Sequence, residues 1–208
     1  MIKYLLFDLD NTLYSSSYGL EDNVRQRIQE FIAAFLGLSI EEAWKQRRER
    51  AGNFSTALEW LMLEKGFADP EAYLSAVHPP DEADSLPPNP QLRAFLEGLP
   101  FPKAILTNSP MEHANRILDK LGVQDLFTHI FDIRFGNYGG KPHSSVFLKA
   151  LDVLGVGIDE VLFIDDFPRY VQGFIDIGGK GLLLDENNFR TEYPHPRIQR
   201  LEELTEYL

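Results

Sequence analysis

The sequence has no cysteine, and its basic residues are outnumbered by its acidic ones. The missing thiols exclude disulfides and thiolate metal sites, and they favour a cytoplasmic protein. Lys and Arg number 20 against 32 Asp and Glu, which gives a formal net charge of -12. A surface this acidic repels the phosphate backbone of nucleic acids. We therefore expect no nucleic-acid polymer among the partners.

Long hydrophobic runs are also missing. No apolar stretch reaches the length of a membrane-spanning helix, and the N-terminus lacks a signal-peptide pattern because Lys3 is soon followed by Asp8 and Asp10. We expect no membrane association. The remaining composition is that of a globular protein, with 44% hydrophobic and 25% charged residues in 208. This length suits one domain with a sizeable insertion or two small domains, and it leaves monomer and homodimer both open.

The N-terminal run from Tyr4 to Phe7, with Leu9, reads as a strand that is buried on both faces, as in parallel sheets. Asp8 and Asp10 interrupt the run at its carboxyl end. Residues two apart on an extended strand point the same way, so both acids can face one site. Ligands of open α/β sheets bind at the carboxyl ends of strands. The acid pair is therefore a candidate reaction centre.

Helical periodicity follows the first strand. The first predicted helix has Asp22 as a candidate N-cap and Gly37 as its stop, and Ser39 with Glu42 forms a capping-box pattern for the second. Pro70 suits the first turn of the fourth. The four helices are predicted at about residues 24–36, 39–50, 55–65 and 70–77. Four helices without an intervening strand indicate a small helical bundle.

The segment 78–90 contains five prolines, which exclude a helix interior or a central strand, and we interpret it as a return linker. Strands and helices alternate after it. Strands are predicted at 103–107, 130–133, 161–164 and 181–184, and helices at 92–99, 111–121, 144–154, 169–177 and 197–207. This order predicts an α/β fold, a Rossmann-like parallel sheet with an inserted small helical bundle, which is called the cap below. The core would be residues 1–15 and 89–208, and the cap residues 16–88.

Polar residues end three of the apolar strands, and they would meet at one edge of the sheet. Asp8 and Asp10 end the first of these strands, Thr107 and Asn108 follow the second, and Asp165 and Asp166 follow the third. Lys141 lies in a loop. Each alone has an ordinary explanation, as a solvated acid, a strand-end hydroxyl, a surface lysine or a helix cap. Together, the crowded carboxylates require a hard divalent cation, and oxygen-only ligands suit Mg²⁺. A hydroxyl and a lysine can hold a phosphoryl group, so the set indicates metal-assisted phosphoryl transfer.

These residues resemble, in order, the four motifs of the haloacid dehalogenase (HAD) superfamily: Asp8-Leu9-Asp10-Asn11-Thr12, Thr107, Lys141 and Asp165-Asp166. The resemblance covers essentially the whole chain, and the helical insertion resembles that superfamily's type C1 cap. The residues within and around these motifs are similar to those of the pyrimidine 5'-nucleotidase-like branch. The similar stretches are Phe7–Tyr14, Leu106–Asn108, His113-Ala114 and Leu121–Val123.

The resemblance implies a role for each motif residue. Asp8 would be the nucleophile that forms an aspartyl-phosphate, and Asp10 would protonate the leaving oxygen and then activate water. Dehalogenases are disfavoured, because the matching motif there lacks the second acid. Mg²⁺ would be held by Asp8, the main-chain carbonyl of Asp10, Asp165 and Asp166. The phosphoryl oxygens would be held by Thr107, Lys141 and the backbone around Asn11, Thr12 and Asn108.

Four further features of the sequence lie outside these motif residues. The loop after the acidic pair departs from the family pattern of a small residue, commonly Ser, with Asn three positions later, because Phe167, Pro168 and Tyr170 occupy it. Asn53 and Phe54, in a predicted cap loop, are candidate substrate-binding residues. The basic run 45–50 is interpreted as a solvated helix face, with the alternative that one of its arginines meets an anionic substrate. The five histidines are interpreted as structural or surface residues: His78, His113, His129, His143 and His195.

The sequence therefore predicts a Mg²⁺-dependent phosphomonoesterase for a small phosphorylated metabolite, with a pyrimidine nucleoside 5'-monophosphate as the first candidate. Phosphatases of sugar phosphates or other small metabolites are the alternative within this class. A catalytically silent binding module is an alternative of another class, suggested by Phe167 and Pro168. A phospho-accepting receiver is disfavoured, because receivers carry the acid pair on the first strand and the acceptor later.

Overall fold

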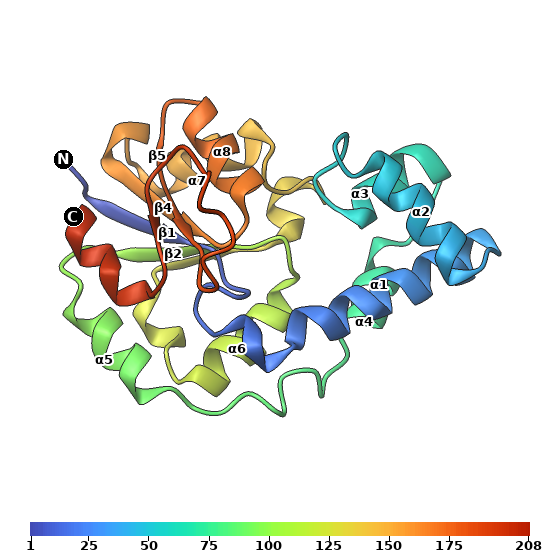
Figure 1. The fold of residues 1–208 in the computed structure, drawn as a ribbon, viewed down its shortest axis with the longest axis horizontal. Helices are drawn as coiled ribbons and strands as arrows, with labels where there is room; N and C mark the ends of the chain where they lie inside the picture. Colours follow the sequence, from blue (N-terminus) through green and yellow to red (C-terminus); the bar gives the residue numbers. More distant parts are fainter.

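A six-stranded, fully parallel sheet forms the centre of the molecule in the computed structural model, which describes residues 1–208 (Figure 1). Its strand order is β3-β2-β1-β4-β5-β6, so the N-terminal strand lies in the interior of the sheet. The strands are β1 (Tyr4–Phe7), β2 (Lys103–Leu106), β3 (His129–Phe131), β4 (Val161–Asp165), β5 (Lys180–Leu184) and β6 (Arg197–Ile198). This confirms the predicted α/β fold with a parallel sheet.

Helices cover both faces of the sheet, because alternate residues of each strand face opposite layers. Leu5 and Phe7 of β1 belong to one buried cluster, which includes residues of α5 (Pro90–Gly98) and α6 (Met111–Leu121). Tyr4 and Leu6 belong to the other, with α7 (Ser144–Leu154) and α8 (Pro168–Asp176). All four β1 residues are buried, so the apolar run is a strand covered on both sides, as predicted.

The register of β1 and β4 places two of the predicted site residues side by side. Leu6 pairs with Phe163 and Phe7 with Ile164, and the backbone N–H of Asp8 then donates to the Ile164 carbonyl at 2.8 Å. Asp8 and Asp165 each stand one position after such a pair. They therefore emerge together at the carboxyl edge of the sheet.

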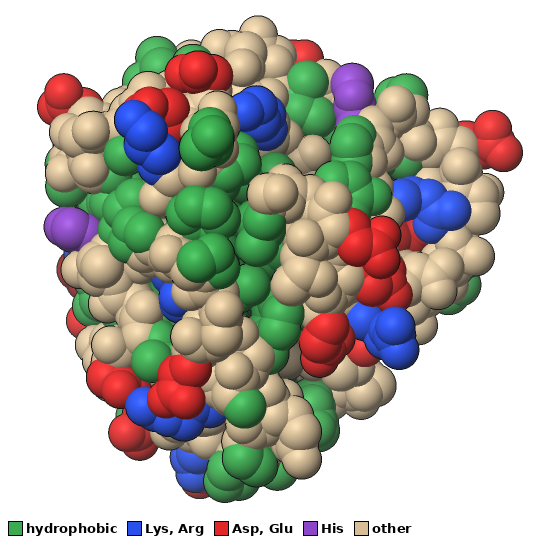
Figure 2. Space-filling view, turned by 90° about the vertical axis from the view of Figure 1, so that its left-hand side faces the viewer, with side chains coloured by type: hydrophobic (Ala, Val, Ile, Leu, Met, Phe, Trp, Pro, Cys, Tyr) green, Lys and Arg blue, Asp and Glu red, His purple; other side chains and the backbone are tan.

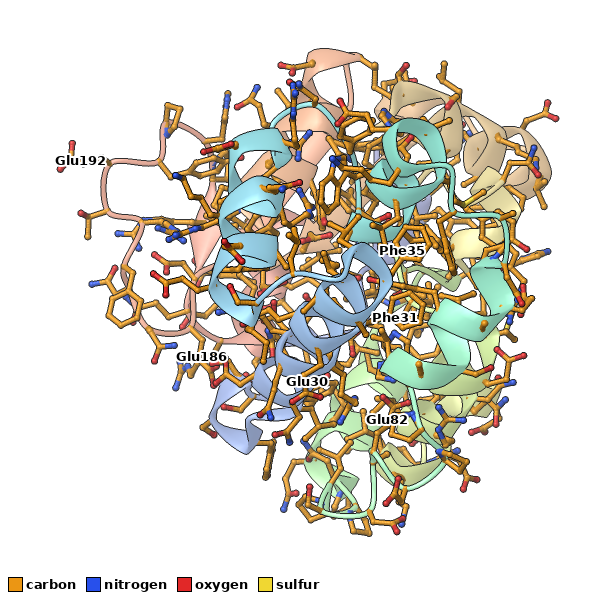
Figure 3. The ribbon with its side chains drawn as sticks, turned by 90° about the vertical axis from the view of Figure 1, so that its right-hand side faces the viewer. Glu30, Phe31, Phe35, Glu82, Glu186 and Glu192 are labelled. Atoms are coloured by element: carbon orange, nitrogen blue, oxygen red, sulfur yellow. The ribbon has the colours of Figure 1, made fainter.

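Four consecutive helices lie to one side of the sheet and are called the cap helices below (Figure 1). They are α1 (Leu20–Leu36), α2 (Ile40–Arg50), α3 (Ala57–Lys65) and α4 (Pro70–Val77). They have their own buried cluster, in which Trp60 is fully buried. Phe31 and Phe35, labelled in Figure 3, project from α1 and make edge-to-face contacts with Phe67, and Phe31 also packs against Tyr73. These contacts join α1 to α4 and to the loop before it.

The ends of the cap helices follow the predicted signals with one exception. The capping box of Ser39 and Glu42 forms at the start of α2, and Gly37 ends α1 in the left-handed conformation. The prediction of Asp22 as the first N-cap is wrong, because α1 begins at Leu20 with Gly19 as the preceding residue. Gly19 has φ of 71°, and it also ends the short 3-10 turn before it.

The predicted terminal helix 197–207 is also wrong in its first half. Arg197 and Ile198 form β6, because the open edge of β5 offers unpaired backbone groups, and Asp185 N–H donates to the Ile198 carbonyl at 2.8 Å. Only Leu201–Tyr207 is helical, and it is a 3-10 helix. The other 3-10 turns are Ser16–Tyr18, Gln124–Leu126, Ile133–Gly136 and Ile158–Glu160.

Figure 2 shows the face of the core that lies away from the cap helices, where hydrophobic side chains lie among charged ones. None of the helices combines the length and the apolar character that crossing a bilayer requires. Many hydrophobic residues of the helices belong to the three buried clusters instead.

Candidate active site

A cavity of about 450 Å³ lies between the carboxyl edge of the sheet and the cap helices. Core residues form one side, and residues of α1, α2, α3 and α4 and of the loop before α3 form the other. The structure brings seven of the predicted site residues into its lining: Asp8, Asp10, Asn11, Thr107, Asn108, Lys141 and Asp166. Asp165 lies directly beneath, with its side chain fully buried.

Lys141 joins the two acids that the sheet register places together. Its Nζ lies 2.7 Å from Asp8 Oδ1 and 2.6 Å from Asp165 Oδ2, and its side chain is 1% exposed. Burial alone would lower the pKa of Lys141, but the charges of Asp165 and Asp8 outweigh it and hold that pKa above its usual range. The lysine is therefore a fixed positive charge at the end of β1.

Asn108 fixes the position of that lysine. Its side-chain amide donates to the Lys141 carbonyl at 3.0 Å, and its Oδ1 accepts from the Lys141 N–H at 2.8 Å. Gly140 is required here, because a Cβ at that position would lie 2.1 Å from Asn108 Oδ1. The Asn108 side chain thus positions Lys141, a role that the sequence did not reveal.

The three carboxylates Asp8, Asp165 and Asp166 form the candidate metal site. One oxygen from each lies within 4.8 Å of the others. Burial and the charge of Asp165 raise the pKa of Asp8 to about 8, and burial raises the pKa of Asp165 and Asp166 as well. Such a buried, all-oxygen cluster with only one lysine to offset its charge fits a hard divalent cation such as Mg²⁺.

Backbone N–H groups near the carboxylates are free to bind an anion. Asn11 has φ of 54°, a left-handed conformation that Asn tolerates, and neither its N–H nor that of Asn108 donates to a protein acceptor. Both residues line the cavity. Thr107, which accepts from the Ser109 N–H at 3.0 Å, adds a hydroxyl. Thr12 is buried behind the turn and does not line the cavity.

Asp10 is held by three donors. Its carboxylate accepts from Tyr14 Oη at 2.6 Å and from Ser109 Oγ at 2.9 Å, and it lies 2.7 Å from His113 Nε2. Burial would raise the pKa of Asp10, but the charge of His113 and the three hydrogen bonds outweigh it and hold that pKa well below its usual range. Asp10 is an oriented carboxylate at the edge of the cavity.

His113 is buried, which agrees with the interpretation of the histidines as structural or surface residues, but its contact with Asp10 was not predicted. It lies on α6, is 1% exposed, and its Nδ1 is 2.7 Å from Glu82 Oε1 in the linker after the cap helices (Glu82 is labelled in Figure 3). Burial would lower the pKa of His113, but Asp10 and Glu82 together raise it to about 10. The sequence signal was its place on the helix that follows Thr107 and Asn108.

His78, Glu82 and His113 also lie close enough together to hold a metal ion, but their surroundings favour an ion-pair network. Arg116 donates to the same Glu82 carboxylate, and Arg27 lies 3.6 Å from it. Two arginines at one carboxylate already supply positive charge, so a metal cation is disfavoured there. The network ties the linker to the helix that carries His113.

The predicted cap-loop residues Asn53 and Phe54 are not brought to the cavity. Asn53 is exposed, and the Phe54 side chain packs against the buried cluster of the cap helices. The backbone of this loop is bound by Arg169 of α8, which donates to the carbonyls of Ala51, Gly52 and Phe54 at 2.7, 2.9 and 3.0 Å. The lining residues come from just beyond it, Ser55, Thr56, Ala57 and Leu58.

The unusual loop after the acidic pair keeps both acids in place. Phe167 N–H donates to Asp165 Oδ1 at 2.8 Å, and Pro168 occupies the first turn of α8, where its missing N–H is not needed. The Phe167 side chain is 43% exposed and stacks edge-on against Tyr170. The bulky residue therefore faces the cavity mouth without displacing the carboxylates.

Comparison with known proteins identifies relatives that match most of the chain. Residues 2–178 match the haloacid dehalogenase-like hydrolase family. A curated relative, glyceraldehyde 3-phosphate phosphatase of Methanocaldococcus jannaschii, is 27% identical over 177 residues, which span 80% of this chain and 77% of the relative.

Solved structures share the fold at lower identity. L-2-haloacid dehalogenase of Xanthobacter autotrophicus superposes with a TM-score of 0.64 at 17% identity, covering 99% of this chain and 98% of that one. A HAD phosphatase of Thermococcus onnurineus superposes with a TM-score of 0.64 at 21% identity, covering 99% and 97%. These likenesses establish the shared architecture.

Proposed function

Because the chain belongs to the haloacid dehalogenase-like hydrolase family, we propose that it hydrolyses small phosphomonoesters through an aspartyl-phosphate on Asp8. The observation that carries this proposal is the placement of Asp8 at the cavity, 2.7 Å from Lys141 and beside the unpaired N–H groups of Asn11 and Asn108. A nucleophile, a cation and free donors around one point are what an in-line attack on phosphorus requires.

In the first step, an Asp8 carboxylate oxygen forms a bond to phosphorus while the bond from phosphorus to the leaving oxygen breaks. Asp10 passes a proton to the leaving oxygen, and this proton is supplied through its contact with His113 Nε2, 2.7 Å away. In the second step, Asp10 takes a proton from a water molecule as its oxygen forms a bond to phosphorus, the bond from phosphorus to Asp8 breaks, and phosphate leaves. Lys141, Thr107 and the two N–H groups stabilise the charge on the phosphoryl oxygens in both steps.

Mg²⁺ is part of the proposal. Asp8, Asp165, Asp166 and the main-chain carbonyl of Asp10 would hold it, and when bound it supplies positive charge to the phosphoryl oxygens. The mutual proximity of three buried carboxylates supports this assignment. The positive charge of Lys141 then offsets the repulsion between the carboxylates of Asp8 and Asp165.

We also propose that residues 16–88 act as a cap of the C1 type that covers the substrate. The cavity is closed on one side by cap residues, and Ser55 Oγ accepts from the Gly140 N–H at 2.9 Å, next to Lys141. A glyceraldehyde 3-phosphate-like sugar phosphate is supported by the name of the curated relative. A pyrimidine nucleoside 5'-monophosphate, supported by the amino-acid sequence of the motifs, is the second candidate.

The test is phosphate release with Mg²⁺ from p-nitrophenyl phosphate, glyceraldehyde 3-phosphate, UMP, CMP and purine nucleotides. We expect turnover that is abolished by Asp8→Asn and by EDTA. Release by Asp8→Asn at the wild-type rate would refute the mechanism. A clear preference for one substrate class decides between the two candidates while leaving the mechanism intact.

A further inference from the structure

One cation in the cavity lining has no partner. The lysine and arginine side chains that line the cavity are Arg25, Arg47 and Lys141. Arg25 lies 3.4 Å from Glu21 and 3.8 Å from Asp22, and Lys141 is bound to two aspartates. Arg47, on α2, has no carboxylate within 4 Å, and its Nη1 is buried without any hydrogen-bond partner.

Other half-buried arginines that contact the cap helices and their loops do find partners. Arg27 donates to the Val77 carbonyl at 2.6 Å, and Arg169 donates to three carbonyls of the loop after α2. A buried guanidinium without an acceptor is unfavourable, because its desolvation is not compensated. Arg47 therefore does not serve the stability of the cap helices in the way that Arg27 and Arg169 do.

The surroundings of Arg47 keep it available to a ligand. Trp44, Tyr73 and Tyr170 line the same cavity and present largely apolar rings. Burial lowers the pKa of Arg47, and the nearby phenol groups of Tyr73 and Tyr170 partly oppose that effect, yet a guanidinium stays charged in proteins. The result is a positive charge in a wall of low polarity, where an oxyanion would be attracted strongly.

Tyr170 connects this charge to the reaction centre. Lys141 Nζ lies 5.1 Å from the centre of the Tyr170 ring, and Tyr170 and Arg47 line the same cavity. Asp8 and Lys141 line the cavity from the core side, and Arg47 lines it from the cap side. A small molecule whose phosphate lies at Asp8 therefore occupies the same cavity as Arg47.

We propose that Arg47 is a specificity residue that binds a second oxyanion of the substrate, a carboxylate or a second phosphate. The proposal rests on the function proposed above and narrows its substrate class to phosphomonoesters that carry a further negative group. Arg is suited to this task, because its planar fork donates two parallel hydrogen bonds to a carboxylate or phosphate.

Two pairs of substrates test the assignment with Mg²⁺ present. The first is 3-phosphoglycerate against glyceraldehyde 3-phosphate, which differ in a carboxylate at C1. The second is fructose 1,6-bisphosphate against fructose 6-phosphate, which differ in a second phosphate. The wild type should show a higher kcat/KM for the member with the additional negative group in at least one pair, and the pair concerned identifies the oxyanion.

Arg47→Gln should remove that preference, lowering kcat/KM for the favoured member by about 10- to 100-fold relative to the counterpart that lacks the additional negative group. Arg47→Lys should retain part of the preference. Arg48→Gln is the matched control, because Arg48 is exposed on the same helix outside the cavity, and it should leave the ratio unchanged.

Three results would overturn the assignment. They are ratios near one in both pairs for the wild type, a preference that persists in Arg47→Gln, and an equal loss for both members of a pair, which would mark Arg47 as structural. If the enzyme preferred UMP over all four compounds and this preference depended on Arg47, Arg47 would instead bind a neutral carbonyl of the pyrimidine base, and the assignment would be wrong. Failure of the proposed function looks different, since no phosphomonoester, p-nitrophenyl phosphate included, would then be hydrolysed.

Discussion

Replacing His113 with Gln tests how strongly the network around Asp10 contributes to the stability of the fold. In the structure, His113 lies between Asp10 and Glu82, at 2.7 Å from each carboxylate, and its side chain is 1% exposed. Gln removes the positive charge but is long enough to keep one hydrogen bond. Asp10 then retains Tyr14 and Ser109 as donors.

The expected magnitude follows from the pKa of His113. A pKa raised from 6.5 to about 10 corresponds to about 5 kcal/mol of stabilisation of the charged form in the folded state. Since Asp10 and Glu82 share this interaction, we take that value as a ceiling. Breaking a buried ion pair by removing one partner typically costs about 3–5 kcal/mol, which agrees with it.

The pH dependence has a definite sign. A group whose pKa is higher in the folded state contributes its full stabilisation below the unfolded-state pKa of 6.5, and that contribution is lost as the pH rises through about 10. The free energy of unfolding of His113→Gln should therefore lie about 3–5 kcal/mol below that of the wild type at pH 6.5. The difference should shrink steadily toward pH 10.

Urea unfolding of the wild type and His113→Gln, followed by circular dichroism from pH 6 to 10 in EDTA, measures this difference. His129→Gln is the control, because His129 is exposed on β3 and touches neither Asp10 nor Glu82. Two curves that stay parallel over the whole pH range would refute the charged state assigned to His113.

Further predictions concern the lysine, the metal and the cap. Lys141→Met leaves Asp8 and Asp165 as buried acids without their cation. In EDTA the unfolding free energy should therefore fall by about 3–5 kcal/mol at pH 9, and by less at pH 5, where the acids are protonated. An equal loss at both pH values would contradict this. Mg²⁺ binding should release protons near pH 7, because the pKa of Asp8 is raised to about 8, and calorimetry in two buffers of different ionisation enthalpy would detect them; identical heats in both buffers would argue against it. Arg169→Gln removes the donors to three cap-loop carbonyls. In steady-state kinetics, KM should rise by about tenfold with a smaller change in kcat. An unchanged KM would count against a role of Arg169 in holding the cap.

The sheet and its acids were predictable because their signals are local. The apolar run before Asp8 needed burial on both faces, and the parallel topology then dictated that Asp8, Thr107 and Asp165 meet at one edge. The capping box at Ser39 was equally local, since both of its partners lie within one helical turn.

What escaped sequence reasoning depends on contacts between distant segments. His113 gains its role only when α6 packs so that its ring meets Asp10 and Glu82, which lie 103 and 31 positions earlier in the chain, and no local pattern encodes that meeting. Asn53 and Phe54 were chosen for their loop, but Arg169 from α8 binds the backbone of that loop and the cavity is lined by later residues. The strand at Arg197 formed because β5 had an open edge.

The measurement that tests the central claim most directly is chemical trapping of the covalent intermediate. The enzyme is mixed with substrate and Mg²⁺, quenched within the first turnovers and reduced with borohydride, which converts an aspartyl-phosphate to homoserine. Peptide mass spectrometry should then find homoserine at position 8 and at no other aspartate, dependent on substrate. Homoserine at another position, or none at position 8 while phosphate is released, would contradict Asp8 as the nucleophile.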